Sequence, residues 1–112
     1  MTKISGRSIY MLTDAGTFSS GHLFALLLKD NKIGILIGEP TGNQVNFNGN
    51  ELQLPIPDTD FYLNISTTKI LRPDQELGDA SALAPDHEVY TTRSDIVSGR
   101  DPQMEYLLKL VK

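Results

Sequence analysis

The chain has 112 residues, a length that predicts a single domain with one core. Its 10 basic and 14 acidic residues give a formal net charge of -4, and the basic residues are scattered, which argues against nucleic acid as a partner. The absence of cysteine excludes thiolate nucleophiles, disulfides and cysteine-based zinc sites. No apolar run approaches the roughly 18 to 20 residues of a bilayer-spanning helix.

Three apolar segments come first in the chain. Residues 8–13 form a short apolar run that predicts a strand buried on both faces. Residues 20–29 are apolar on nearly all sides, which predicts a buried helix, and the β-branched run at 33–38 predicts a second strand. This order predicts a βαβ unit with a right-handed crossover, and so an α/β fold.

The middle of the chain is expected to form antiparallel strands. Turn-forming residues predict a loop at 39–43, after which apolar and polar residues alternate up to the hairpin-turn pair at 48–49. The return strand would include residues 52–54, and a second turn over 55–60 would lead into a last strand over 61–68. One face of that strand would belong to the core, and the other would be wetter.

The C-terminal third combines a loop and a helix. Residues 72–86 show little periodicity and contain proline and glycine, which predicts a long loop. Apolar residues at i, i+3, i+4 and i+7 spacing over 104–111 predict a terminal helix. Asp101 is expected to cap this helix, with Pro102 at its first position.

The turn at residues 14–21 joins the first strand to the first helix and carries Ser19 and Ser20. The backbone N–H groups of Ser20 and Gly21 would be free at the helix start, where the helix dipole favours a developing negative charge. This arrangement is typical of half an oxyanion hole beside a serine nucleophile. The alternative is a helix N-cap, in which a serine stabilises the helix by about 1 kcal/mol without any chemistry.

Five motifs occur in a fixed order: Ile9–Thr13, Thr17–His22, Gly38–Gly42, Pro85–Val89 and Gly99–Gln103. Together they resemble the C-terminal half of the C-terminal-processing, or tail-specific, serine peptidases, a family related to tricorn-type proteases. The resemblance covers most of the chain. It implies a crotonase-like α/β fold, with a βαβ core, an antiparallel hairpin or meander and a C-terminal helix.

The resemblance places the family nucleophile on Ser19 and an oxyanion-hole N–H on Ser20. Many family members activate the serine with a lysine, but the matching position here holds Gln44. Because an amide does not accept a proton near neutral pH, a Ser-Lys dyad of that type is excluded. The remaining, tricorn-like route takes its base from a histidine in the N-terminal part of the catalytic domain, and Glu76 is the match to the assisting glutamate.

Both histidines have ordinary interpretations. A pairing of His22 with Ser19 is one option, but nothing in the sequence orients the ring, which favours a partly buried or solvated histidine. His87 has acidic neighbours, yet adjacent residues of a strand point to opposite faces, which favours a solvated loop end over a metal site. Calcium-loop and phosphate-loop motifs do not occur, so the sequence predicts no metal and no cofactor.

The function implied by the resemblance is serine endopeptidase activity, through an acyl-enzyme on Ser19. Residues 1–112 are expected to be a single domain that forms the C-terminal part of a larger catalytic domain, inactive by itself because the base lies outside it. The expected partners are a polypeptide substrate, the N-terminal part of the same protein and, through an exposed apolar surface, a second copy in a homodimer. The resemblance also implies an extracytoplasmic or membrane-associated full-length protein.

Two alternatives compete with the peptidase hypothesis. The first is a non-catalytic relative that binds an extended peptide along an edge of the hairpin. The second is an unrelated α/β domain whose motifs match by chance. That second alternative predicts that Ser19 will not lie in a cleft at a helix N-terminus.

Overall fold

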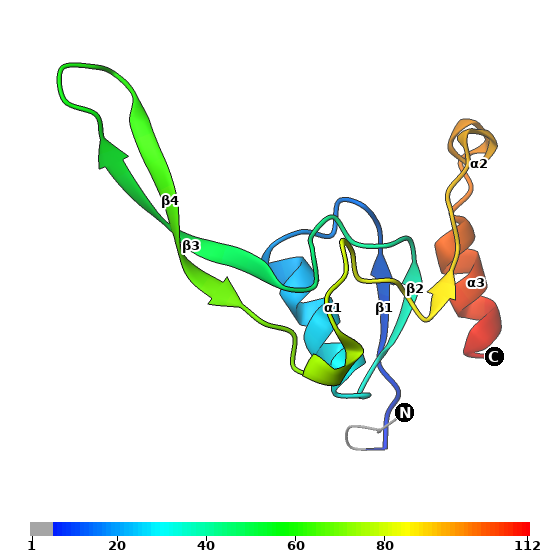
Figure 1. Cartoon of the computed structure of the whole chain (residues 1–112). Helices are drawn as coiled ribbons and strands as arrows, with labels where there is room; N and C mark the ends of the chain where they lie inside the picture. Colours follow the sequence, from blue (N-terminus) through cyan, green and yellow to red (C-terminus); the bar gives the residue numbers. More distant parts are fainter. Residues whose placement is uncertain (1–5) are drawn as a thin grey trace.

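The computed structural model describes residues 6–112 and shows a mixed α/β body from which a long hairpin projects (Figure 1). The elements in chain order are β1 (Tyr10–Thr13), α1 (Ser20–Asp30), β2 (Ile35–Gly38), β3 (Phe47–Pro55), β4 (Tyr62–Ile70), the 3-10 helix η1 (Gln75–Leu77), β5 (His87–Glu88), α2 (Arg93–Ser98) and α3 (Pro102–Leu110). Over this described range, no helix has the length and apolar character needed to cross a membrane. The α/β class, with parallel and antiparallel sheets and a C-terminal helix, is confirmed.

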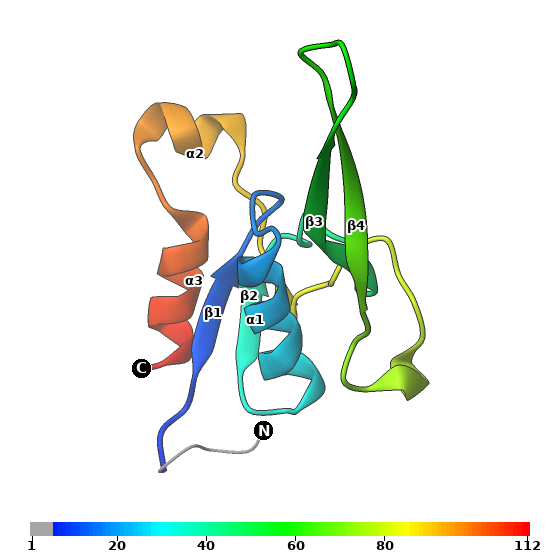
Figure 2. The same cartoon turned by 90° about the vertical axis from the view of Figure 1, so that its left-hand side faces the viewer.

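The body is built on a three-stranded parallel sheet in the order β1-β2-β5. Tyr10 pairs with Ile35 and Thr13 with Gly38, and α1 is the connection between the two strands. The helices α1 and α3 lie on opposite faces of this sheet (Figure 2). The predicted strand-helix-strand unit is therefore confirmed, and each of its strands begins two residues later than expected.

The core is formed by α1, the sheet and two loop residues, Val45 and Leu83. Its buried members are Ala25, Leu26, Leu28, Leu36, Val45 and Leu83. One side of α1 remains open, with Phe24 54% exposed and Leu27 41% exposed. Five of its residues are buried, so the expected helix packed against a sheet is confirmed, although the sheet covers only one of its faces.

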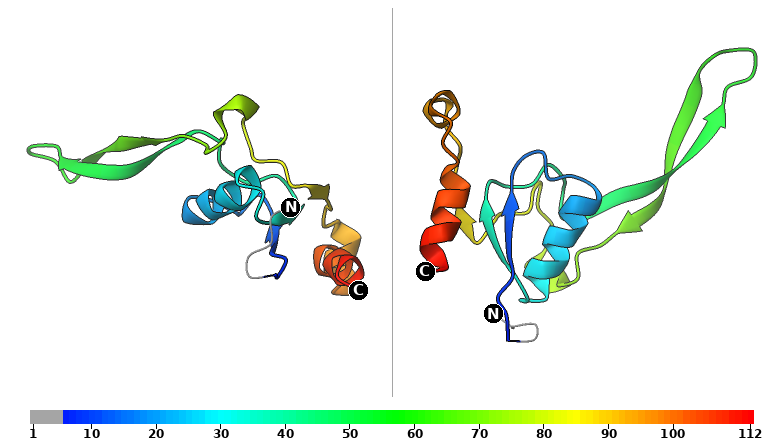
Figure 3. Two further views of the ribbon diagram at one scale, coloured as in Figure 1. Left: turned by 90° about the horizontal axis from the view of Figure 1, so that it is seen from below. Right: turned by 180° about the vertical axis from the view of Figure 1, so that it is seen from behind.

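The strands β3 and β4 form one long antiparallel hairpin instead of the expected arrangement with two turns. Phe47 pairs with Ile70 at the base, and Pro55 pairs with Tyr62 next to the single turn. Figure 3 shows this hairpin reaching away from the body in two further views. The projection explains the long dimension of the molecule, whose extents are 61 × 38 × 25 Å.

The predicted turn at residues 48–49 is wrong because these residues lie inside β3. The turn-forming tendency appears instead as a distortion at Asn50, which has a left-handed φ of 51°. The Thr67 hydroxyl donates to the Asn50 carbonyl at 2.7 Å, and the Asn50 side chain donates to the Thr68 hydroxyl at 3.1 Å. These bonds hold the two strands together across the distortion, and the strand pairing resumes at Glu51 and Ser66.

One face of the hairpin is apolar and exposed. Residues that pair across an antiparallel ladder share a face, and alternate residues point to opposite faces. The apolar face carries Leu52, Leu54, Ile56, Phe61, Leu63 and Ile65, which are between 41% and 71% exposed. The expectation that residues 61–68 present one face to the core is therefore wrong within the described chain, since no element of it covers this face.

The segment 72–86 is a loop that contains only the short helix η1, as expected. Its start is fixed by a buried ion pair, in which the Arg72 guanidinium donates to both carboxylate oxygens of Asp30 at 3.0 and 2.9 Å. The Asp74 backbone N–H also donates to Asp30, at 3.1 Å. Burial by itself would raise the pKa of Asp30, but the bonds from Arg72 and Asp74 outweigh it and lower that pKa.

The C-terminal helix begins as predicted. The Asp101 side chain accepts from the Met104 N–H at 2.9 Å, and Pro102 occupies the first turn. Helix α2 was not anticipated, although its start has a capping box in which Thr92 and Asp95 bond each other's backbone N–H groups. The Thr-x-x-Asp pattern followed by Gly99 was the signal that could have revealed it.

Candidate active site

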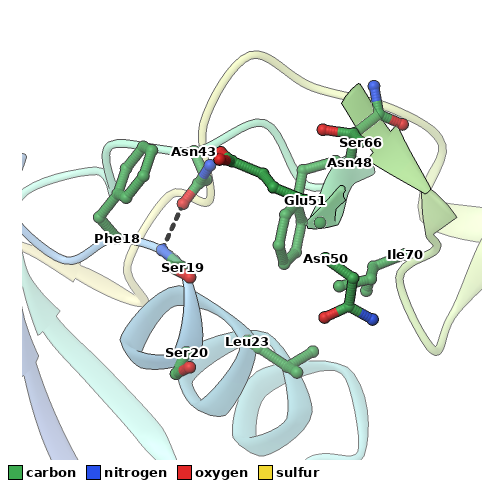
Figure 4. Close-up of a pocket in the computed structure, with 12 residues that line it drawn as sticks. Phe18, Ser19, Ser20, Leu23, Asn43, Asn48, Asn50, Glu51, Ser66 and Ile70 are labelled. Carbon is green, nitrogen blue, oxygen red and sulfur yellow. Dashed lines mark hydrogen bonds between the residues drawn. The ribbon is translucent and has the colours of Figure 1, made fainter. Parts of the chain in front are cut away.

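Ser19 lies at the N-terminal end of α1, on the wall of an open groove (Figure 4). The groove has a volume of about 490 Å³ and lies between the helix start, the loop before β3 and the base of the hairpin. It is lined by Phe18, Ser19, Ser20, Leu23, Asn43, Phe47, Asn48, Gly49, Asn50, Glu51, Ser66 and Ile70. The chance-match alternative predicted that Ser19 would not lie in a cleft at a helix start, and that prediction is wrong.

The backbone of Ser19 adopts a conformation that residues other than glycine rarely adopt. Its φ is 52° and its ψ is -118°, and such conformations cost on the order of 1–3 kcal/mol. Ser19 holds the N-cap position, yet its side chain makes no capping hydrogen bond. A serine on a strained strand-to-helix turn, with its hydroxyl free at the surface, has the geometry of a nucleophile elbow.

The backbone amides around this turn differ in their hydrogen bonding. The Ser19 N–H donates to the Asn43 side-chain oxygen at 2.6 Å, and the Gly21 N–H donates to the Phe18 carbonyl at 3.1 Å. For the Ser20 N–H, no acceptor is found within residues 6–112. The first amide of α1 is therefore open to a ligand, at the end of the helix where the dipole favours negative charge.

His22 belongs to α1, where its side chain is buried, and it does not pair with Ser19. Its Nδ1 lies 2.8 Å from the Thr41 hydroxyl, and its ring packs edge-on against Phe47 with 5.1 Å between the centroids. Burial lowers the pKa of His22 more than the nearby Gln44 backbone raises it. The ring is thus buried more deeply than expected, and it is absent from the groove lining.

Neither Glu76 nor Gln44 lines the groove. Glu76 belongs to η1, and its backbone N–H donates to Asp74, whose own N–H is bound to Asp30 at the other end of α1. That helix has 11 residues and is about 15 Å long. The described part of the chain therefore does not bring Glu76 to Ser19, and the groove lining contains one ionisable side chain, Glu51.

His87 lies in β5 and is only partly exposed, so the expectation of a solvated loop end is wrong. Its Nδ1 lies 3.0 Å from the Tyr106 hydroxyl. The Asp86 carboxylate is turned toward the sheet, where it accepts from the Leu36 N–H at 2.8 Å. No group of three or more histidine or acidic side chains that could hold a metal ion was found in residues 6–112.

Comparison with known proteins gives one clear result. The model of peptidase family S41 matches residues 2–89 of the chain. This range includes the strained turn and every residue that lines the groove. No curated protein matches the chain.

Proposed function

The chain belongs to peptidase family S41, and we propose that it acts in serine-type peptide hydrolysis with Ser19 as the nucleophile. The observation that carries the proposal is the strained backbone of Ser19 at the start of α1. The Ser19 side chain makes no capping hydrogen bond, and the residue lines the groove. A serine that only capped α1 would use its hydroxyl to bind an N–H of the first turn. Here the hydroxyl stays available for chemistry.

The proposed reaction begins when the Ser19 Oγ attacks a peptide carbonyl carbon and its proton passes to a base. The carbonyl oxygen becomes an oxyanion, for which the free Ser20 N–H is the proposed donor. Loss of one such donor typically costs about 3 kcal/mol of transition-state stabilisation. The C–N bond then breaks, the amine leaves with the proton, and water hydrolyses the acyl-enzyme.

We propose that the general base comes from the N-terminal part of the catalytic domain, with this chain as the C-terminal part. The groove lining contains neither lysine nor histidine within residues 6–112. Gln44 is exposed and cannot accept a proton, and His22 is buried away from the groove. Glu76 stays a prediction for the assisting role, although it lies at the far end of α1.

The exposed apolar face of the hairpin supports the same division of the catalytic domain. Six apolar side chains on one face of a two-stranded ribbon are typical of a surface that another polypeptide covers. We propose that the N-terminal part of a crotonase-like catalytic domain packs there.

A Leu63→Lys variant should weaken that association, whereas Asn64→Lys, on the opposite face, should not. A stable homodimer of the chain alone, lost in Leu63→Lys, would instead identify a second copy as the cover.

The nucleophile assignment is tested on the full-length protein with a fluorophosphonate probe. Ser19→Ala should abolish both labelling and peptidase activity, because it removes the attacking oxygen. Ser20→Ala should keep both, because only the backbone of Ser20 takes part. Labelling at Ser20, or full activity in Ser19→Ala, would overturn the assignment.

A second candidate is peptide binding without catalysis. It is favoured by the outer edges of β3 and β4, which pair with no other strand in the described chain and could accept an extended peptide. In this case the protein would bind peptides equally well with and without the Ser19 hydroxyl, and the probe would not label it. Probe labelling at Ser19 together with peptide hydrolysis would exclude this candidate.

A further inference from the structure

Asn43 makes a direct contact with the candidate nucleophile from 24 positions away in the chain. Its side-chain oxygen accepts the Ser19 N–H at 2.6 Å, and the bond spans the end of the groove (Figure 4). This N–H would otherwise be an unsatisfied donor beside the strained turn. The bond therefore fixes the peptide unit that leads into Ser19, on one side of its strained φ.

A second bond joins the Asn43 loop to the same turn. The Gly42 N–H donates to the Thr17 carbonyl at 3.0 Å. A side chain at Gly42 would place its Cβ 2.3 Å from the Ala15 carbonyl oxygen, so only glycine allows the loop to approach this closely. Two consecutive residues of the loop thus bind both sides of the turn.

The loop is itself held from the interior. Thr41 is buried, and its hydroxyl accepts the Leu83 N–H at 3.0 Å and lies 2.8 Å from the His22 Nδ1. Since His22 belongs to α1, the loop is tied to the helix that Ser19 begins. Asn43 therefore acts on the turn from a support that is fixed relative to α1.

We propose that Asn43 is a positioning residue that holds Ser19 in its strained conformation and occupies the Ser19 N–H. Occupying that amide leaves the Ser20 N–H as the free donor beside the nucleophile. The inference rests on the proposed function, because it assigns Asn43 a role in the reactivity of Ser19. It adds to that function a residue that binds the backbone of the nucleophile and not its reacting oxygen.

The test combines amide hydrogen exchange at Ser19 with the rate of fluorophosphonate labelling, both on the full-length protein. Asn43→Ala should speed exchange of the Ser19 amide and slow labelling by about tenfold to 100-fold, an effect typical of a misplaced nucleophile. The loss should fall on the maximal labelling rate, with the probe concentration at half-saturation unchanged. Asn43→Asp keeps an acceptor oxygen and should restore slow exchange and much of the labelling.

The control is Asn31→Ala, because Asn31 is an exposed asparagine at the other end of α1, outside the groove lining, and its side chain donates to the Leu27 carbonyl at 2.8 Å. It should leave exchange and labelling unchanged.

Wild-type exchange and labelling in Asn43→Ala would overturn the inference, as would faster exchange with unchanged labelling. If Asn43→Ala does not fold, an unprotected Ser19 amide in Asn43→Asp overturns it. A wild-type protein that the probe does not label defeats the proposed function instead, and amide exchange still reports on the Asn43 bond.

Discussion

The two ends of α1 differ in how completely their polar groups are satisfied. At the C-terminal end, Asp30 is buried and accepts three hydrogen bonds, two from Arg72 and one from the Asp74 backbone. At the N-terminal end, Ser19 is exposed and strained, and it makes no side-chain cap. One helix therefore carries an anchored end and an open end.

This difference shows how the fold can tolerate a costly turn. An open amide at the positive end of a helix is useful where negative charge develops during a reaction, but it adds nothing to stability. The short helix α2 provides the contrast, since the side chains of Thr92 and Asp95 bond each other's backbone N–H groups at its start. The open end of α1 is thus a local feature, and the anchor at Asp30 supplies stability elsewhere on the same helix.

The largest expected effect comes from breaking the anchored end. Arg72→Met should lower the free energy of unfolding by about 3–5 kcal/mol, because it leaves the Asp30 carboxylate buried without its partner. Urea denaturation measures this loss. The control is Arg100→Met, which removes an exposed ion pair with Glu105 and should cost much less. Equal losses in the two variants would mean that the buried pair does not anchor the helix.

Acid should weaken the two supports of α1 in separate ranges. Burial lowers the pKa of His22 in the folded chain from its ordinary value of 6.5. Just below pH 6.5, the His22 ring therefore takes up a proton only in the unfolded chain. The free energy of unfolding should fall as the pH decreases from about 6.5. The pKa of Asp30 is lowered from 3.8, so its contribution persists above that value and is lost as the pH falls through its folded pKa.

Denaturation curves at a series of pH values measure both steps. His22→Gln should remove the step below about pH 6.5 and leave the more acidic one. A wild-type stability that stays flat between about pH 7.5 and 5 would contradict the assignment of His22 as a buried, neutral ring.

The smallest expected effect concerns the open end. Ser19→Gly should raise the free energy of unfolding by about 1 kcal/mol, because glycine adopts a positive φ without strain and no capping bond is lost. Thr92→Ala, at the start of α2, should instead lower it by about 1 kcal/mol because it removes a working cap. Thermal unfolding of the two variants beside the wild type makes the comparison. A loss of stability in Ser19→Gly would show that Ser19 serves as an ordinary cap.

Local signals in the sequence predicted several elements correctly. Apolar runs indicated β1, α1 and β2, and the Asp101–Pro102 pair indicated the start of α3. The turn at Asn48–Gly49 was predicted from equally good local chemistry, but the strand partners of β4 overrode it. Local turn preference is worth little against a continuous ladder of cross-strand pairs.

The candidate site shows the same limit. Motif order predicted Ser19 and Ser20 as site residues, and the structure places both at a helix start in the groove lining. Their roles stay predictions. Asn43 could not be identified, because its bond to Ser19 joins residues 24 positions apart and leaves no periodic pattern. The burial of His22 against Thr41, 19 positions away, was hidden for the same reason.

The sequence by itself determined β1, α1, β2 and the start of α3, and it placed Ser19 on the first strand-to-helix turn, because each of these depends on residues that are neighbours or follow a short period. The resemblance of five short motifs in a fixed order indicated the family. The tertiary structure alone decided that Arg72 reaches Asp30, that Asn43 holds Ser19 and that one face of the hairpin remains uncovered. These features depend on where distant segments meet in space. The open and the anchored ends of α1 are therefore products of packing, even though a single run of 11 residues forms the helix between them.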